Sequence, residues 1–247
     1  MGIKIFIRSI LVVTAKNIKI YYNKGPVIIF GLLFPSFLFL SFYLGRDLDF
    51  FYFFPGLLAM SLFFTASSVG PLITPWEKQA GTYERLLSFP VTLNSIILGD
   101  VLAGMVFGAA INIIVGAAGI LILGYNPQYL VFISALLVSS FCFASLGVLL
   151  ASPPVKAPSQ VMMYSSMVRF PLIFISGIFI PLERLGSKGR LIAAISPITY
   201  LVDLFHHSFT GLNLMPLYLS FTALGLFSAG FLIAAGGFHR RNHLRGL

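Results

Sequence analysis

Few residues of this 247-residue chain are of the types that perform chemistry, and the most suggestive group lies near its C-terminal end. His206 and His207 follow Asp203 by three and four residues. On a helix this spacing would place the three side chains on one face, where they could bind a metal ion. One carboxylate beside two adjacent histidines is more typical of hydrated side chains. We therefore expect no metal site.

Sequence signatures of catalysis are missing as well. No lysine follows a glycine, so the Gly-Lys-Ser/Thr phosphate loop of ATP-hydrolysing proteins cannot be present. Ser145 lacks the preceding glycine of a nucleophile elbow, and the single cysteine, Cys142, excludes an internal disulfide. We expect that this chain is not an enzyme and holds no cofactor of its own.

The composition indicates an integral membrane protein. Hydrophobic residues make up 58% of the chain and charged residues 9%, whereas soluble domains carry about 25% charged residues. A membrane-spanning helix needs about 20 mainly apolar residues. The sequence predicts an all-α protein whose domain, residues 25–247, has six transmembrane helices. These are residues 25–44, 50–72, 96–123, 129–150, 161–180 and 214–237.

Lysine and arginine gather on one side of these predicted spans. They concentrate before the first span, between spans two and three, between spans four and five, and after the last span. By the positive-inside rule, this pattern predicts a multi-pass protein of the cell (inner or plasma) membrane with both termini in the cytoplasm. The formal net charge of +9 lies on that face, so it does not indicate binding of nucleic acid.

Residues 1–24 predict an amphipathic helix that lies along the cytoplasmic leaflet. On a helical wheel Lys4, Arg8, Lys16 and Lys19 share one arc, and apolar side chains lie mostly opposite. We expect the basic arc to face anionic lipid headgroups, so membrane lipid is an expected partner. The alternative is a disordered basic tail.

Two ionisable residues fall within the predicted spans, Asp100 and Arg169. Their depths differ by about 7 Å at 1.5 Å per residue, a distance that an arginine side chain nearly bridges. A pair between them is therefore one hypothesis, and the alternative is that Asp100 reaches the membrane interface. We expect Arg169 to face protein or water rather than lipid, because an exposed charge would make its span a marginal inserter.

A regular stripe of small residues marks the third predicted span. Small residues four apart let two helix backbones approach closely, and an asparagine among them can donate a hydrogen bond across the contact. We interpret the stripe as a helix-packing face, within one subunit or between two. Its residues are Gly104, Gly108, Asn112 and Gly116.

The cytoplasmic connection, residues 73–95, predicts one short helix bracketed by Pro75 and Pro90. A solvated interfacial turn is the alternative. The charged side chains expected on its wet face are Glu77, Lys78, Glu84 and Arg85. The side chains expected to pack are Trp76, Tyr83, Leu86 and Leu87.

The external connection, residues 181–213, predicts short helices that dip into the outer leaflet and return. Its pieces are separated by the polar turn at residues 186–189 and by Ser196-Pro197, and each is too short to cross the membrane.

The order of these elements resembles that of the ABC type-2 permease family, the membrane subunits of ATP-driven exporters of the drug or lipo-oligosaccharide type. Residues 77–87 are similar to the family's Glu-x-x-x-Gly-Thr-x-Glu-x-Leu stretch. The other stretches that carry the resemblance are residues 31–35, 171–182 and 196–203. Together these stretches run through almost the whole chain in the family's order, although His206 stands where relatives often carry arginine.

The resemblance implies two permeases around a central path, each docked on a separate cytoplasmic ATPase subunit that binds ATP and Mg²⁺. We expect a homodimer rather than a heterodimer. Residues 73–95, here named the coupling segment, would transmit ATPase motion through the helix Trp76–Leu87, with Gly81 and Thr82 inside the motif. The external helices would include Pro181, Pro197, Tyr200 and Asp203.

The resemblance also favours export of a hydrophobic or amphipathic substrate, either a drug or a lipid-like molecule. One alternative is export of a polysaccharide or lipo-oligosaccharide by the same mechanism. An ion-driven secondary transporter is a second alternative, although the sequence lacks the midplane carboxylates expected of one.

Overall fold

A computed structural model describes residues 3–22, 24–25, 50–89, 91–153, 158–180, 182 and 185–244, together with isolated positions between residues 29 and 44. The first predicted span, residues 25–44, lies largely outside the described residues, as does Pro181. No strand occurs in the part of the chain that is described, in agreement with the predicted all-α class.

The helices differ widely in length. The long ones are α1 (Ile3–Tyr21), α4 (Phe50–Ser68), α7 (Leu93–Leu123), α8 (Tyr129–Leu150), α9 (Pro158–Phe174) and α12 (Leu217–Leu244). The shorter ones are α5 (Gly70–Gln79), α6 (Thr82–Leu87), α10 (Ser187–Ala193) and α11 (Pro197–Thr210).

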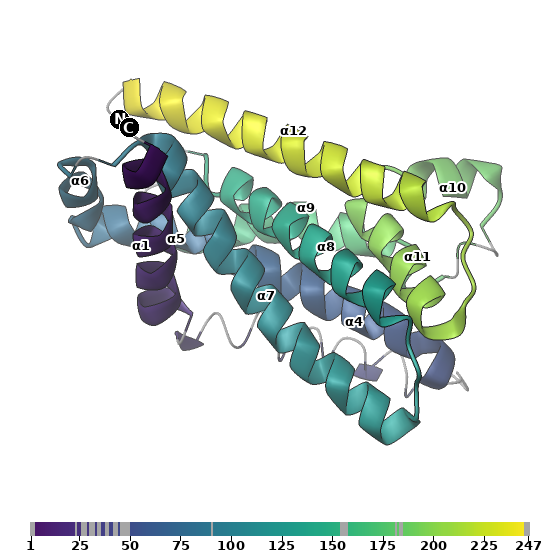
Figure 1. The fold of residues 1–247 in the computed structure, drawn as a ribbon. Helices are drawn as coiled ribbons and strands as arrows, with labels where there is room; N and C mark the ends of the chain where they lie inside the picture. Colours follow the sequence, from purple (N-terminus) through teal and green to yellow (C-terminus); the bar gives the residue numbers. More distant parts are fainter. Residues whose placement is uncertain are drawn as a thin grey trace.

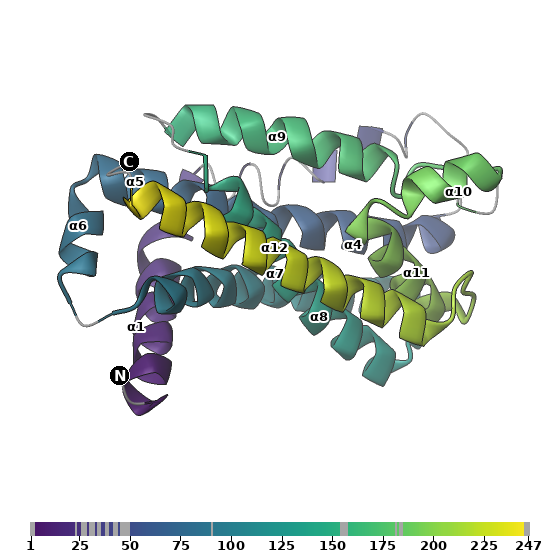
Figure 2. The same cartoon turned by 90° about the horizontal axis from the view of Figure 1, so that it is seen from above.

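The long helices form a bundle that distinguishes the two ends of the molecule. Helices α4, α7, α8 and α12 run lengthwise, and α1 lies across them at one end beside α5 and α6 (Figure 1). Helices α10 and α11 lie at the opposite end, and α9 runs along one side of the bundle (Figure 2). The crosswise direction of α1 is the one expected of a helix in the plane of a membrane surface.

Four stretches of the described chain are long and apolar enough to cross a membrane. They are Phe53–Gln79, Leu93–Ile122, Tyr129–Leu150 and Leu217–Arg241. They coincide with the second, third, fourth and sixth predicted spans, and the first of them also takes in α5.

The fifth predicted span, residues 161–180, differs from the structure. Helix α9 ends at Phe174 after 17 residues, because the chain then turns through Gly177, whose φ of 89° lies in the left-handed region that favours glycine. The prediction of six full-length spans is therefore not matched by the described residues.

The small-residue stripe of α7 packs inside one chain. A Cβ atom on Gly108 would meet the Ala66 Cβ of α4 at 2.7 Å, and one on Gly104 would meet the Ala144 Cβ of α8 at 2.9 Å. One turn further along, Asn112 Nδ2 donates a hydrogen bond to Thr65 Oγ1 over 3.3 Å. Backbones at this separation require glycine, so the stripe fixes how α7 lies on α4 and α8.

Candidate functional site

The coupling segment contains two helices rather than the predicted one. Helix α5 continues through Pro75 to Gln79, and α6 begins at Thr82. The break falls at Gly81, whose φ is 65°. The prediction of one helix bracketed by prolines was wrong because this left-handed residue, rather than either proline, interrupts the helix.

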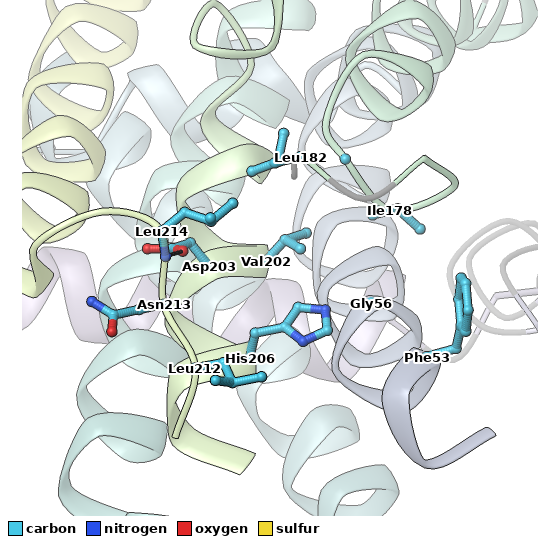
Figure 3. A pocket seen from close by; sticks show the side chains of 11 residues that line it. Phe53, Gly56, Ile178, Leu182, Val202, Asp203, His206, Leu212, Asn213 and Leu214 are labelled. Atoms are coloured by element: carbon cyan, nitrogen blue, oxygen red, sulfur yellow. Dashed lines mark hydrogen bonds between the residues drawn. The ribbon is translucent and has the colours of Figure 1, made fainter. Parts of the chain in front are cut away.

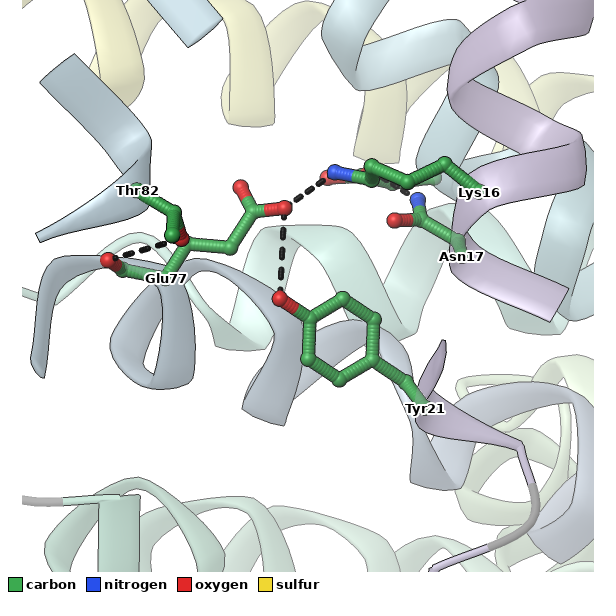
Figure 4. A network of polar contacts seen from close by, with 6 residues as sticks. Lys16, Asn17, Tyr21, Glu77 and Thr82 are labelled. Atoms are coloured by element: carbon green, nitrogen blue, oxygen red, sulfur yellow. Dashed lines mark hydrogen bonds and ion pairs between the residues drawn. The ribbon is translucent and has the colours of Figure 1, made fainter. Parts of the chain in front are cut away.

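Glu77 points into the protein, not toward water. Its side chain is buried, with the residue 3% exposed, and forms an ion pair with Lys16 of α1. Tyr21 Oη donates a hydrogen bond to the same carboxylate oxygen over 3.4 Å (Figure 4). The expectations that Glu77 belongs to the wet face and that Lys16 faces headgroups were therefore wrong: the two charges neutralise each other at the junction of α1 and α5.

Helix α1 is also fastened to α7. Asn17 Nδ2 donates a hydrogen bond to Asp100 Oδ1 over 2.6 Å, and Thr14 Oγ1 donates to the Gly99 carbonyl over 3.1 Å. We name these two contacts and the Lys16–Glu77 ion pair the α1 tether. Through it a single turn of α1 holds both the coupling segment and a membrane-spanning helix.

The predicted pair between Asp100 and Arg169 is not formed. Asp100 accepts its hydrogen bond from Asn17, and Arg169 Nε donates to the Ser165 carbonyl of its own helix over 3.3 Å. Among the residues that the structure describes, the only ion pair joins Lys16 and Glu77. The prediction that Arg169 avoids lipid agrees with its burial.

Aromatic stacking reinforces the α1 tether. The rings of Tyr21 and Trp76 stack with centroids 5.6 Å apart, and Lys24 Nζ lies 4.3 Å from the Trp76 ring centroid. Burial, followed by the Glu77 charge, raises the pKa of Tyr21 above its ordinary value. Tyr21 therefore remains a phenol that donates to Glu77 throughout the physiological pH range.

The remaining residues of the coupling segment form its outer face. Lys78, Glu84 and Arg85 are exposed, as predicted, and so are Gly81 and Thr82. Tyr83 is half-buried, and burial together with the charges of Asp100 and Glu77 raises its pKa to about 12. Thr82 Oγ1 donates to the Glu77 carbonyl over 3.3 Å, which joins α6 to the end of α5.

Two adjoining grooves lie between α1 and the coupling segment, and each is lined by residues of both. The first has a volume of about 600 Å³, and its lining includes Lys16, Lys24, Trp76 and Arg85. The second, of about 430 Å³, is mostly apolar and runs on along the N-terminal half of α1. Both are lined by Leu86 and Phe89. The grooves form one surface with a basic end and an apolar end, suited to receiving a protein segment.

The residues predicted to be external form structural contacts. Asp203 Oδ1 accepts a hydrogen bond from the Leu214 backbone N–H over 2.7 Å, and Oδ2 accepts one from Ser220 over 3.4 Å. Tyr200 Oη donates to the Ala194 carbonyl over 3.1 Å, and Pro197 occupies the first turn of α11.

Asp203 and His206 of α11 line a cavity of about 30 Å³ (Figure 3). A cavity of this volume has room for one or two water molecules. No cluster of three potential metal ligands occurs within the described ranges. The cavity therefore offers space for water.

Burial raises the pKa of Asp203, so folding favours its protonated form. This contribution to stability is fully present below about pH 4, the ordinary pKa of an unfolded aspartate, and is lost as the pH rises through the raised value. As the pH rises from about 4 through the raised pKa of Asp203, we expect the melting temperature of the wild type to fall relative to that of the Asp203→Asn variant. Thermal unfolding of both proteins in detergent across pH 4–7 measures the difference, and parallel profiles would contradict it.

Comparison with known proteins identifies the chain. The family model described as ABC-2 type transporter matches residues 8–210, from the first turns of α1 to the end of α11. The chain belongs to the ABC-2 type transporter family. ABC-2 permeases are the membrane subunits of ABC transporters and work with a separate ATPase subunit. The exposed face of the coupling segment is thus part of the membrane subunit and not of the ATPase.

Two relatives of this ABC-2 permease are similarly distant. Inner membrane transport permease YadH of Escherichia coli K12 is 28% identical over 177 residues, covering 72% of this chain and 69% of YadH. Nodulation protein J of Rhizobium leguminosarum bv. viciae is 28% identical over 167 residues, covering 63% of this chain and 61% of that protein. The matches support a multi-pass membrane permease.

Sequence reasoning missed the α1 tether. Its partners lie 61 residues apart for Lys16 and Glu77 and 83 residues apart for Asn17 and Asp100. One signal was available: Asn17 shares a helical face with Val13 and Tyr21, and a lone polar residue among apolar ones needs a buried partner.

Proposed function

We propose that this ABC-2 permease pairs with a second copy and exports a hydrophobic or amphipathic substrate from the cytoplasm or inner leaflet. The energy comes from a separate ATPase, which binds ATP and Mg²⁺ and docks on the coupling segment. The observation that carries the proposal is the exposed charge of Lys78, Glu84 and Arg85 beside the grooves, on a segment held by the α1 tether.

The connection between the segment and the bundle suits force transmission. Helix α5 follows α4 with only Val69 between them, and Glu77 near its end is bound to Lys16. Displacement of α6 by an ATPase would therefore move α5 and α1 together. This motion would shift the balance between inward-facing and outward-facing states of the permease.

We propose that the permease lies in the inner membrane with both termini in the cytoplasm. Helix α1 begins and α12 ends at the end of the molecule that carries α6 (Figure 1). Arg240 Nη2 also donates to Asn94 Oδ1 over 3.1 Å, so the basic end of α12 lies beside the start of α7. The concentration of positive charge at this end supports the orientation.

For the substrate, we propose a drug-like or lipid-like molecule, with a polysaccharide or lipo-oligosaccharide as the alternative. Either class of substrate would be exported by the same ATP-driven mechanism. We propose no ion-driven transport, because the permease of an ABC transporter works with an ATPase partner.

Charge reversal on the exposed face tests the docking. In the double variant Glu84→Lys/Arg85→Glu, we expect the amount of ATPase that co-purifies with the tagged permease from native membranes to fall at least tenfold. The reason is that opposite charges that face each other across the interface become like charges. The measurement is ATP hydrolysis in the eluate per mole of permease.

The matched control reverses a charge at the other end of the molecule. Lys188 is exposed on α10, and Lys188→Glu is expected to retain the ATPase at the wild-type level. Equal loss in both variants would show a general effect of charge, and full retention in the double variant would exclude docking at this face.

A further inference from the structure

Arg169 of α9 is a buried cation that takes no part in the α1 tether. The buried face of α9 consists of Val161, Ser165, Arg169 and Ile173. Arg169 is 3% exposed and Ser165 is fully buried. Ionisable residues in membrane helices are costly to insert, and they usually mark a site that a substrate or ion uses.

The hydrogen bonds of this face are incomplete. Arg169 Nε donates to the Ser165 carbonyl over 3.3 Å, and the guanidinium carbon lies 5.8 Å from the centroid of the Phe64 ring. Arg169 Nη1 and Ser165 Oγ are both buried without a hydrogen-bond partner. A guanidinium offers five N–H donors, and the two on Arg169 Nη1 have no acceptor among the residues that the structure describes.

The described residues also contain no anion that neutralises Arg169. Glu77 pairs with Lys16, Asp100 binds Asn17, and Asp203 binds the Leu214 backbone. Glu84 is exposed on α6. A buried charge is costly unless it is paired and hydrogen-bonded, so a partner from another molecule would stabilise Arg169.

The donors identify the chemistry of that partner. A guanidinium and a hydroxyl one helical turn apart on the same face fit an oxyanion, because arginine binds phosphate and carboxylate through paired N–H donors. Phe64 and Ile173 beside them provide an apolar surface. We propose that Arg169 and Ser165 bind the oxyanion headgroup of an amphiphile, an inference that rests on the proposed export of amphipathic substrates.

The position of the site links it to the coupling segment. Helix α9 packs mainly against α5, and α5 runs from that contact to Glu77 in the α1 tether. The site is closed in this arrangement, so a headgroup enters when α9 and α5 separate. Occupancy of the site therefore changes the position of the helix that leads to the ATPase.

The test uses the intact permease–ATPase complex in phosphatidylcholine nanodiscs, with dodecyl phosphate as the anionic probe and dodecyl maltoside as the neutral one. We expect Arg169→Gln to weaken binding of dodecyl phosphate at least tenfold and Ser165→Ala to weaken it severalfold. Arg169→Lys keeps the charge but not the paired donors, and we expect an intermediate loss. Lys188→Gln on α10 is the matched control and should bind as the wild type does.

Binding of the neutral probe checks that each variant is folded and should be unchanged. If Arg169→Gln does not fold, Arg169→Lys and Ser165→Ala still decide the matter through the ratio of anionic to neutral binding. An unchanged ratio in these variants overturns the proposal, and that is also the result expected if the partner of Arg169 is a carboxylate of a second copy.

Two further arms identify the source of the headgroup. If bilayer lipid supplies it, phosphatidylglycerol in the nanodisc competes with dodecyl phosphate in the wild type but not in Arg169→Gln. If an exported molecule supplies it, dodecyl phosphate stimulates ATP hydrolysis in the wild type and phosphatidylglycerol does not. Either result supports the oxyanion site.

The same measurements separate this proposal from the proposed function. Binding that depends on Arg169 in a complex that exports no amphiphile would leave the site intact and remove the export function. Export of dodecyl phosphate at the wild-type rate by Arg169→Gln would do the opposite.

Discussion

Glu77→Gln is expected to abolish most ATP-driven transport while leaving the permease in the membrane. The substitution keeps the size of the side chain but removes the charge that faces Lys16 and Tyr21. Hydrogen bonds to charged groups contribute about 1.5–3 kcal/mol. Because Lys16 keeps some access to water, we expect the free energy of unfolding to fall by about 1–2 kcal/mol. We expect the rate of transport to drop at least tenfold. Transport in proteoliposomes and thermal unfolding measure the two effects.

Two comparisons identify the cause. Glu84→Gln removes a charge from the same segment, but Glu84 is exposed, so its melting temperature should equal that of the wild type. The exchange Lys16→Glu/Glu77→Lys restores opposite charges and should recover part of both stability and transport. Failure of the exchange together with wild-type transport in Glu77→Gln would remove the α1 tether from the mechanism.

Gly108→Ala is expected to disrupt the contact between α7 and α4. The added methyl group would lie 2.7 Å from the Ala66 Cβ and 3.1 Å from its Cα, and a backbone atom cannot rotate away. Overpacking of this kind costs about 1–3 kcal/mol, so we expect a lower melting temperature and poor yield of folded permease. Thermal unfolding in detergent and size-exclusion chromatography are the measurements.

A second glycine in a long apolar helix provides the control. Nothing lies within 4 Å of a Cβ on Gly225 of α12, so Gly225→Ala should be neutral or slightly stabilising. The double variant Ala66→Gly/Gly108→Ala removes the nearest methyl group and should recover part of the lost stability. Equal behaviour of Gly108→Ala and Gly225→Ala would mean that the α7 stripe does not set the packing.

The long helices could be predicted because their signals are local. The fourth predicted span has the bounds of α8, Tyr129–Leu150, since an apolar run between polar turns specifies both ends. Helix α7 begins three residues earlier than predicted, at Leu93, where Thr92 and Ser95 form a capping box. The packing role of Gly104 and Gly108 was also readable from their spacing, although its partner helices were not.

The candidate site was predicted less well because its contacts join distant parts of the chain. The charged residues around Glu77 are typical of a solvated helix, but in the structure Glu77 is buried and contacts Lys16 and Tyr21 of α1. The hypothesis that Asp100 pairs with Arg169 rested on their depth in the membrane, but depth does not tell which side of a helix faces which neighbour. The direction in which α1 crosses the bundle decides that Asn17 reaches Asp100 instead.

Helix α1 begins and helix α12 ends at the end of the molecule that carries α6, which has a practical consequence (Figure 1). Two copies can be joined in one polypeptide by a linker that runs from the end of α12 to the start of the next α1 and never passes through lipid. Such a concatemer fixes the stoichiometry at two and allows one half alone to carry a substitution, so the number of intact halves that a working transporter needs can be counted.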